Sequence, residues 1–230
     1  MKKPLHFIIR IQLTFLSLSI LACSSLMAQS YSGGNGVSGD PYLISNKADL
    51  KYLSENSGEW SKYFKQTADI AFVDSDFQSG GDFYNSGEGF IPIGTPTNPF
   101  TGSYDGDDHT IDGLYINQGD GYYIGFFGYV ETCEINNLGL TNVNITGHYD
   151  VGAVVGRAIS CTVTNCYSTG NVHGVDDYIG GFVGKNYSAT LNNCFSSCSV
   201  TGEDYVGGFV GTNYTSGKEY DCYALGDVTA

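Results

Sequence analysis

The chain has 230 residues and is strongly acidic, with 24 acidic and 10 basic residues and a net charge of −14 at pH 7. We expect no nucleic-acid partner, because phosphate backbones are bound by basic surfaces. An acidic balance of this kind keeps an exported protein soluble. The 32 glycines and 18 tyrosines favour short strands and tight turns, and the length suits one β-rich domain.

Residues 1–28 have the pattern of a secretory signal peptide, with basic residues, an apolar run and the small residue Ala28 before the cleavage point. An alternative stays open, because the residues before Cys23 are close to a bacterial lipobox, in which Cys23 would be acylated to give an outer-membrane lipoprotein. Leu21 fits a lipobox poorly, so ordinary signal-peptide cleavage is favoured over lipidation of Cys23. No later segment approaches the ~18 apolar residues of a membrane span. The sequence therefore predicts a secreted or cell-surface protein without a transmembrane segment after signal removal.

Residues 29–120 are predicted to form an N-terminal cap and irregular first coils. Asn46 stands at the N-cap position of a helix over residues 47–53, and this helix would cover the open edge of the first coil. Residues 63–73 are predicted to form a strand, and residues 74–89 a polar loop.

From residue 121 to residue 230 the chain repeats a unit of 27 or 28 residues. The unit YIGGFVGKNYSATLNNCFSSCSV begins at Tyr178, and similar units begin at Tyr149 and Tyr205. Each apolar cluster is short and bounded by Gly or Asn, which predicts three short strands per unit. A repeat of this length predicts a solenoid. The expected fold is all-β: a right-handed, single-stranded parallel β-helix with a short N-terminal capping helix.

One unit per coil would align equivalent residues in rows along the stack. A glycine row allows unusual turn dihedrals or close approach of the backbone. An asparagine row suits left-handed turns, with side-chain amides bonded from coil to coil. A cysteine row packs in the core as a small hydrophobe, although export and a spacing of about 4.8 Å leave a disulfide open. The predicted structural rows are Gly156, Gly184 and Gly211; Asn165 and Asn193; and Cys166, Cys194 and Cys222.

The tetrapeptide GFVG at 181–184 and 208–211, with NCYSTG at 165–170 and NCFSSC at 193–198, resembles the GLUG-motif repeats of secreted bacterial surface proteins. The earlier segments FIPIG and INNLGLTNVNITG are similar to the region that precedes such repeats. The resemblance implies an extracellular, adhesin-like protein or a non-catalytic part of a large secreted peptidase. The motif itself contains no catalytic residues, so the resemblance implies none in this chain. We also expect no cofactor.

Aromatic residues on the outside of the coils are the predicted ligand-binding candidates. A strip of rings can stack on sugars or anchor a protein, so extracellular glycans and host or surface proteins are the expected partners. That these rings only stabilise neighbouring coils is nevertheless the favoured interpretation. The candidates are Tyr167, Phe195, Tyr223, Tyr178, Tyr205, Tyr187 and Tyr214.

Acidic residues recur at one turn of the repeat, where oxygen ligands could hold Ca²⁺, although solvated turn residues are the favoured interpretation. These residues are Asp150, Asp176, Asp177, Glu203 and Asp204. A second acidic cluster, SYDGDDH at 103–109, suggests a polysaccharide lyase or glycoside hydrolase with paired carboxylates. A turn into the following strand explains that cluster adequately and is the favoured interpretation.

The sequence therefore predicts an exported cell-surface β-helical module that acts as an adhesin-type binding surface or a structural stalk, without intrinsic catalysis. A further repeat unit would begin directly after Ala230. We therefore expect an exposed final coil in a chain that is truncated at its C-terminus.

Overall fold

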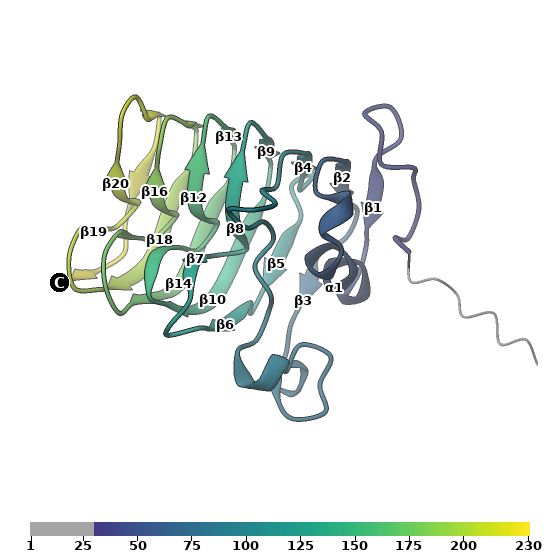
Figure 1. Cartoon of the computed structure of the whole chain (residues 1–230), viewed down its shortest axis with the longest axis horizontal. Coiled ribbons are helices and arrows are strands. Elements are labelled where there is room, and N and C mark those ends of the chain that lie inside the picture. Colours follow the sequence, from purple (N-terminus) through teal and green to yellow (C-terminus); the bar gives the residue numbers. More distant parts are fainter. Residues whose placement is uncertain (1–29) are drawn as a thin grey trace, which may run out of the picture.

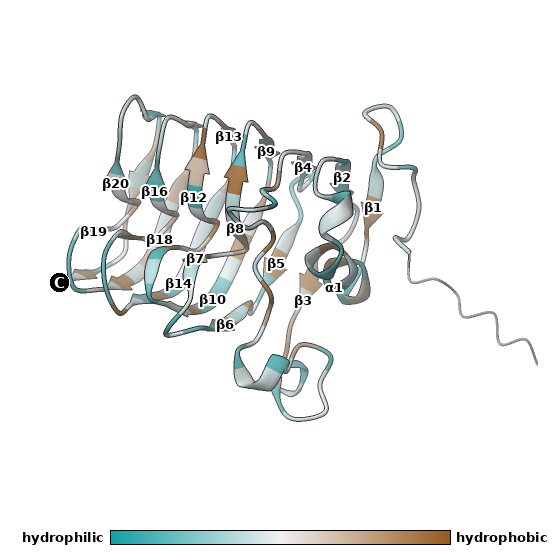
Figure 2. Cartoon of the chain, in the orientation of Figure 1, coloured by the Kyte–Doolittle hydropathy of each residue, from teal (hydrophilic) through white to brown (hydrophobic). Residues whose placement is uncertain are grey.

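The computed structural model describes residues 30–230, so the predicted signal peptide and the alternative lipid-attachment residue Cys23 lie outside the described residues. The described chain is a parallel β-solenoid of about five turns, which confirms the predicted β-helix. Figure 1 shows the strands stacked along one axis, with the first described residues near one end and the C-terminus at the other. Hydrophobic bands alternate with paler or hydrophilic ones along the strands (Figure 2).

The coils are built from four parallel sheets. Sheet 1 contains β1 (Tyr42–Ile44), β2 (Tyr63–Gln66), β4 (Ser103–Asp105), β9 (Glu134–Asn136), β13 (Thr162–Thr164), β17 (Thr190–Asn192) and β21 (Lys218–Tyr220). Sheet 2 contains β3 (Ile70–Ala71), β5 (Thr110–Asp112), β6 (Tyr115–Asn117), β10 (Gly139–Gly147), β14 (Tyr167–Gly174), β18 (Phe195–Thr201), β22 (Tyr223–Ala224) and β23 (Val228–Thr229). Sheet 3 contains β7 (Tyr122–Ile124), β11 (Tyr149–Gly152), β15 (Ile179–Gly180) and β19 (Val206–Gly207), and sheet 4 contains β8 (Phe127–Glu131), β12 (Val155–Ile159), β16 (Val183–Asn186) and β20 (Val210–Asn213).

Each repeat unit contributes four strands, the fourth being divided into β22 and β23 in the last unit, so the prediction of three strands per unit is wrong. In the unit that starts at Tyr149, the first apolar cluster is divided between β11 and β12, which belong to different sheets. The chain turns at Ala153 and Val154, and both side chains are fully buried. Both corner residues are apolar, like the strand residues before and after them. The sequence pattern alone therefore predicts one continuous strand.

The glycine row stands just after these corners, at the second residue of β12, β16 and β20, because two backbone segments approach each other there. The register of sheet 4 aligns Gly156 with Gly184 and Gly184 with Gly211. None of these three glycines has a positive φ. A Cβ on Gly184 would lie 2.5 Å from the Val151 nitrogen and 2.8 Å from the Gly156 oxygen. Close approach, and not a special dihedral, therefore requires glycine here.

The interior is rich in aromatic residues in the early coils and mainly aliphatic in the later ones, where Phe182 and Phe209 are the buried rings. Phe126 and Phe127 are fully buried, and the Tyr104 ring meets both edge-on at 5.8 and 5.7 Å. Further along the stack Val163 pairs with Leu191 in register, and both are fully buried. A buried side chain of this size stabilises the fold by about 1.5–3 kcal/mol.

The predicted capping helix is confirmed as α1 (Lys47–Glu55), which lies at the N-terminal end of the stack (Figure 1). The Asn46 side chain accepts a hydrogen bond from the Asp49 amide at 3.1 Å, as an N-cap residue should. Leu50 and Leu53 are fully buried against the first coil. With nine residues, α1 is short, and none of the helices among residues 30–230 is long and apolar enough to cross a membrane.

The strand predicted over residues 63–73 is interrupted: β2 ends at Gln66, and β3 begins at Ile70. The Gln66 side chain is fully buried and its amide donates to the Ala68 and Thr110 carbonyls at 2.8 and 2.9 Å, so it closes a corner of the coil. Three short 3-10 helices occur, η1 (Ser57–Glu59), η2 (Asp74–Phe77) and η3 (Asn85–Gly87). The last two lie in the predicted polar loop.

The asparagine row forms a hydrogen-bonded ladder on the outside of the stack. The Asn193 amide donates to the Asn165 side chain at 2.8 Å, Asn165 donates to Asn137 at 3.1 Å, and Asn137 donates to Asp105 at 2.9 Å. The three asparagines have φ of 51°, 55° and 53°, a region that asparagine tolerates better than most residues. Asp221 has the same conformation one coil later, but a carboxylate has no N–H to extend the ladder.

Asp221→Asn is expected to stabilise the protein, because the new amide can donate to Asn193 and lengthen the ladder by one bond. A net hydrogen bond is worth about 0.5–1.5 kcal/mol. Urea unfolding of the variant and the parent measures the gain. Asp227→Asn removes the same charge from the same coil without joining the ladder, so an equal gain in that control would assign the effect to charge alone.

The final coil is exposed, as the sequence predicts. Strands β19, β20, β21 and β22 stand at the ends of their sheets. Tyr220 and Tyr223 are 51% exposed and Leu225 is 71% exposed. Among residues 30–230, no helix or strand covers the outer side of this coil.

Candidate ligand-binding face

Three long neighbouring strands, β10, β14 and β18, present an uncharged polar surface to solvent. In a chain with 24 acidic and 10 basic residues, these strands contain no Asp, Glu, Lys or Arg. Their inward side chains, such as Val143, Ile145 and Val172, are buried. Their outward side chains, termed the neutral face here, are Thr141, Asn142, Asn144, Thr146, Thr169, Asn171, His173, Ser197, Ser199 and Thr201.

Parallel register arranges the neutral face in rows. Asn144 is aligned with Asn171, which is aligned with Ser199. In the next row, the His173 Nδ1 and the Thr201 Oγ1 are hydrogen-bonded at 2.8 Å. Hydroxyl and amide groups therefore recur along the stack at the spacing of neighbouring strands, about 4.8 Å.

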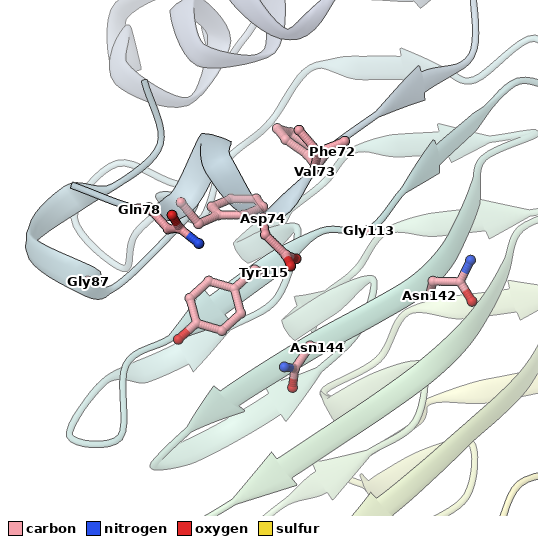
Figure 3. A pocket seen from close by; sticks show the side chains of 10 residues that line it. Phe72, Val73, Asp74, Gln78, Gly87, Gly113, Tyr115, Asn142 and Asn144 are labelled. Atoms are coloured by element: carbon pink, nitrogen blue, oxygen red, sulfur yellow. The ribbon is translucent and has the colours of Figure 1, made fainter. Parts of the chain in front are cut away.

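A groove of about 460 Å³ borders the neutral face where the loop that carries η2 lies over sheet 2. Figure 3 shows Tyr115 and Asn144 on neighbouring strands, with Asp74 and Gln78 on the loop beside them. The Tyr115 ring lies 5.4 Å from the ring of Phe77, which is packed in turn against Phe72 at 5.2 Å. The groove lining is Phe72, Val73, Asp74, Phe77, Gln78, Gly87, Gly113, Tyr115, Asn142 and Asn144.

The groove combines an aromatic ring with amide groups that have fixed positions. The Asn142 amide donates to Asp112 Oδ1 at 2.7 Å, and the Thr141 hydroxyl donates to the same oxygen at 2.6 Å. Asn144 and Gln78 are exposed, so their side-chain amide donors and carbonyl acceptors are accessible to a ligand. A ring that offers an apolar surface, beside amides that bind hydroxyl groups, suits a sugar. The lining contains no Lys or Arg that would favour an anionic ligand.

Tyr167, Phe195 and Tyr223 form an aromatic ladder beside the neutral face, at the start of β14, β18 and β22. Their rings are 5.1 and 5.2 Å apart and tilted by only 4° and 3°. The ladder ends at Gly139, which is aligned with Tyr167 and lies in the coil before it. A Cβ at Gly139 would lie 2.6 Å from the Tyr167 ring, so no further side chain fits there. These three rings therefore stabilise the stack and also flank the candidate face.

The other four aromatic candidates gather elsewhere, around Lys185. The Lys185 ammonium lies 4.1 Å from the centre of the Tyr178 ring and 5.2 Å from that of Tyr214. Tyr205 stands 5.0 Å from Tyr178, and Tyr187 stands 5.0 Å from Tyr214. These are cation–π and stacking contacts that join coils. The seven predicted rings thus form two groups, of which only the ladder adjoins the neutral face.

Asp150 corrects the prediction that the acidic candidates share a solvated turn. It is fully buried, and its Oδ2 accepts from Arg157 Nε at 2.5 Å, while its Oδ1 has no hydrogen-bond partner. Burial raises the pKa of Asp150 to about 6 and outweighs the lowering effect of Arg157. Register places Asp150 in a row with Tyr123 and Tyr178, so it replaces a ring and not a turn residue.

The remaining acidic candidates stay near the surface. Asp176 lies 3.7 Å from His148, and Glu203 and Asp204 are exposed. Burial, followed by repulsion from Asp176 and Asp204, raises the pKa of Asp177. Within residues 30–230, no three His, Cys, Asp or Glu side chains are grouped to hold a metal ion.

The SYDGDDH cluster consists of β4 and the turn that leads from it to β5. Asp107 and Asp108 have φ of 50° and 64°. Asp105 accepts from Asn137 and from the Asp107 amide, and Asp107 lies 3.0 Å from Lys65. The carboxylates of Asp105 and Asp107 thus have structural partners within the turn and between coils.

Sequence reasoning missed the neutral face and the groove residue Tyr115. A signal for the face was present, because GLTNVNITG, YSTGNVHG and FSSCSVT all lack formal charge. The groove had no such signal, since it joins residues 72–78 to residues 142–144 only after the chain has folded.

Comparison with known proteins supports the repeat assignment. The family model of the GLUG motif matches residues 147–172, which include β11, β12 and β13. Halomucin of Haloquadratum walsbyi is 37% identical over 148 residues, which are 61% of this chain and 2% of halomucin. A protein of Evansella cellulosilytica designated a Gly-rich membrane protein is 34% identical over 153 residues, which are 65% of this chain and 15% of that protein. The chain therefore spans a small part of these relatives.

A solved structure shares the fold. It is a Bacteroides ovatus protein designated an immunoglobulin A1 protease, with a TM-score of 0.61 and 20% identity, covering 86% of this chain and 70% of the other. At this identity the likeness concerns the fold alone. The match shows that residues 147–172 carry a GLUG motif, and the 28-residue register of the coils is consistent with repetition of that motif along the stack.

Proposed function

We propose that the chain is a non-catalytic module of the cell surface that binds uncharged polysaccharide through the neutral face and its groove. One observation carries the proposal: three adjacent strands of a strongly acidic protein carry no formal charge, and they adjoin a groove with an aromatic ring and amides. Hydroxyl groups of a neutral glycan can donate to and accept from Asn, Ser and Thr side chains. An acidic glycan would be repelled by the net charge of −14.

The relatives favour a surface location. One is named a membrane protein and the other a halomucin, and neither name denotes an enzyme. A surface location also agrees with the predicted signal peptide. A stalk that only spaces other domains is the competing role, and it requires no ligand on the neutral face.

Binding to a polysaccharide panel tests the proposal. Affinity gel electrophoresis of the purified protein would compare neutral glucans, mannans and xylans with acidic alginate and polygalacturonate. Retardation by at least one neutral polysaccharide and by none of the acidic ones is expected. Absence of retardation by every member would leave the stalk role, and retardation by acidic members alone would refute the assigned chemistry.

Tyr115→Ala is expected to weaken polysaccharide binding about tenfold, because a central aromatic contact is worth more than about 1 kcal/mol and 1.4 kcal/mol equals a factor of ten. Tyr115→Phe keeps the ring and should retain most of the affinity. Titration calorimetry measures both variants. Tyr187→Ala serves as the control, since this tyrosine is exposed and lies outside the neutral face. Equal losses in the Tyr115 and Tyr187 alanine variants would contradict the assignment of the groove.

A further inference from the structure

Cys133 and Cys161 differ from the other described cysteines because their sulfur atoms are directly hydrogen-bonded to each other. The two Sγ atoms are 2.8 Å apart, and the side chains are 5% and 2% exposed. Non-bonded heavy atoms are most stable at about 3.5–4.0 Å. Two thiols at this distance are therefore crowded, and neither can move into solvent without opening the coil.

The backbone around the pair already has the geometry that a disulfide needs. Cys133 precedes β9 and Cys161 precedes β13, and these strands pair in register with Glu134 opposite Thr162. The Thr162 amide donates to the Cys133 carbonyl at 3.0 Å, so the strand pairing includes the cysteines. Neighbouring parallel strands lie about 4.7–4.9 Å apart, within the Cα separation of about 4.4–6.8 Å that disulfides span.

The cysteine row on the other side of sheet 1 has different contacts. Cys166 Sγ donates to the Thr164 carbonyl at 3.2 Å and contacts the Ile135 carbonyl at 3.8 Å. Cys194 and Cys222 repeat this pattern, with one carbonyl in their own coil and one in the coil before. Cys161 has one such contact, to the Ile159 carbonyl at 3.2 Å, whereas the Cys133 sulfur is directed at Cys161.

We propose that Cys133 and Cys161 form a disulfide that joins two successive coils, while Cys166, Cys194, Cys198 and Cys222 remain thiols. The inference does not depend on polysaccharide binding. It selects one pair among the stacked cysteines because, among the described residues, only Cys133 and Cys161 are joined by a sulfur–sulfur hydrogen bond. An oxidising compartment, which the predicted export provides, is the setting in which such a bond persists.

The bond forms by thiol–disulfide exchange with an external disulfide, such as oxidised glutathione or the disulfide of an oxidoreductase. One cysteine thiolate attacks the oxidant and forms a mixed disulfide, and one oxidant thiol leaves. The second cysteine thiolate then attacks the protein sulfur of the mixed disulfide and releases the other oxidant thiol. The two electrons and two protons of the protein thiols end on the oxidant. Burial raises the pKa of Cys133 well above its ordinary value, so exchange takes place while the coils are docking and not after they close.

Peptide mapping of the full chain tests the proposal. The protein is exported in a bacterial host or refolded with oxidised and reduced glutathione, and then alkylated under denaturing, non-reducing conditions. The expected result is a cross-linked peptide pair that contains Cys133 and Cys161 and is lighter than its reduced form by two hydrogens, with Cys166, Cys194, Cys198 and Cys222 alkylated. Alkylation of Cys133 and Cys161 as well, or a cross-link between Cys166 and Cys194, would overturn the proposal.

Reductant dependence gives a second measurement. Reduction is expected to lower the thermal midpoint by roughly 5–10 °C, given the usual effect of closing a loop of this length. Cys133→Ser and Cys161→Ser should each remove this dependence, and Cys166→Ser should keep it. If a serine variant fails to fold, peptide mapping of the parent still decides the question. A midpoint that reductant does not change in the parent would refute a stabilising bond.

Discussion

Gly184→Ala is expected to destabilise the protein by about 3 kcal/mol or more, the upper range for adding one carbon atom to a packed interior. The added Cβ would lie 2.5 Å from the Val151 nitrogen, 2.6 Å from the Asp150 carbonyl carbon and 2.8 Å from the Gly156 oxygen. All three are backbone atoms in a neighbouring coil, so no side-chain rotation can relieve the clash. Two coils would have to separate.

Urea unfolding followed by circular dichroism measures this effect. Gly119→Ala is the matched control, because a Cβ there meets nothing within 4 Å and its φ is not positive. Its free energy of unfolding should stay within about 0.5 kcal/mol of the parent. If Gly184→Ala proved as mild as the control, the close contact between the coils at this corner would be refuted.

The buried carboxyl of Asp150 is expected to make stability fall as pH rises from about 4 to about 6. Its pKa is about 6 in the folded chain, compared with the ordinary value of 3.8. Between these values the folded state holds a proton that the unfolded state has lost. The unfolded state therefore binds fewer protons, and the free energy of unfolding decreases with pH. The difference of about two pKa units corresponds to about 3 kcal/mol.

Asp150→Asn isolates this contribution, since an amide imitates the protonated carboxyl and does not titrate. The free energy of unfolding of the variant, relative to the parent, should increase by about 2–3 kcal/mol between pH 4 and pH 7. The attraction of Arg157 for the ionised carboxylate is already contained in this pKa, so loss of the ion pair adds no separate constant offset. Asp204→Asn is the control for removal of an exposed charge. If the free energies of unfolding of the parent and of Asp150→Asn changed with pH in parallel, the raised pKa of Asp150 would be contradicted.

The repeat made most of the fold predictable. Cys166, Cys194 and Cys222 recur at a constant spacing. A unit of this kind can bury its apolar clusters only by stacking on copies of itself, and the strand register follows from the spacing. The capping helix was also accessible, because Asn46 carries a local signal that needs no tertiary context. Both features depend on near neighbours in the sequence or on exact periodicity.

The details that escaped prediction depend on how a coil bends. Ala153 and Val154 form a corner, and both are apolar and buried. No change in the alternation of polar and apolar residues marks the turn in the sequence. Asp150 looked like a turn residue because Asp176 and Asp177 recur nearby, yet the register places it one row away, beside Arg157. The groove at Tyr115 required the loop that carries η2 to fold back over sheet 2, which no periodic pattern encodes.

The stacking direction also determines how the protein would respond to force. Successive coils are joined by hydrogen bonds such as Val154 to Phe182 and Asn165 to Asn192, and the two ends of the described chain lie at opposite ends of the stack (Figure 1). Tension between those ends would load the bonds of one coil at a time. Each coil that opens would release 28 residues, an extension of roughly 90–100 Å. A bond between Cys133 and Cys161 would keep the coil between them closed, so that the chain would lengthen in discrete steps from its last coil toward this fixed point.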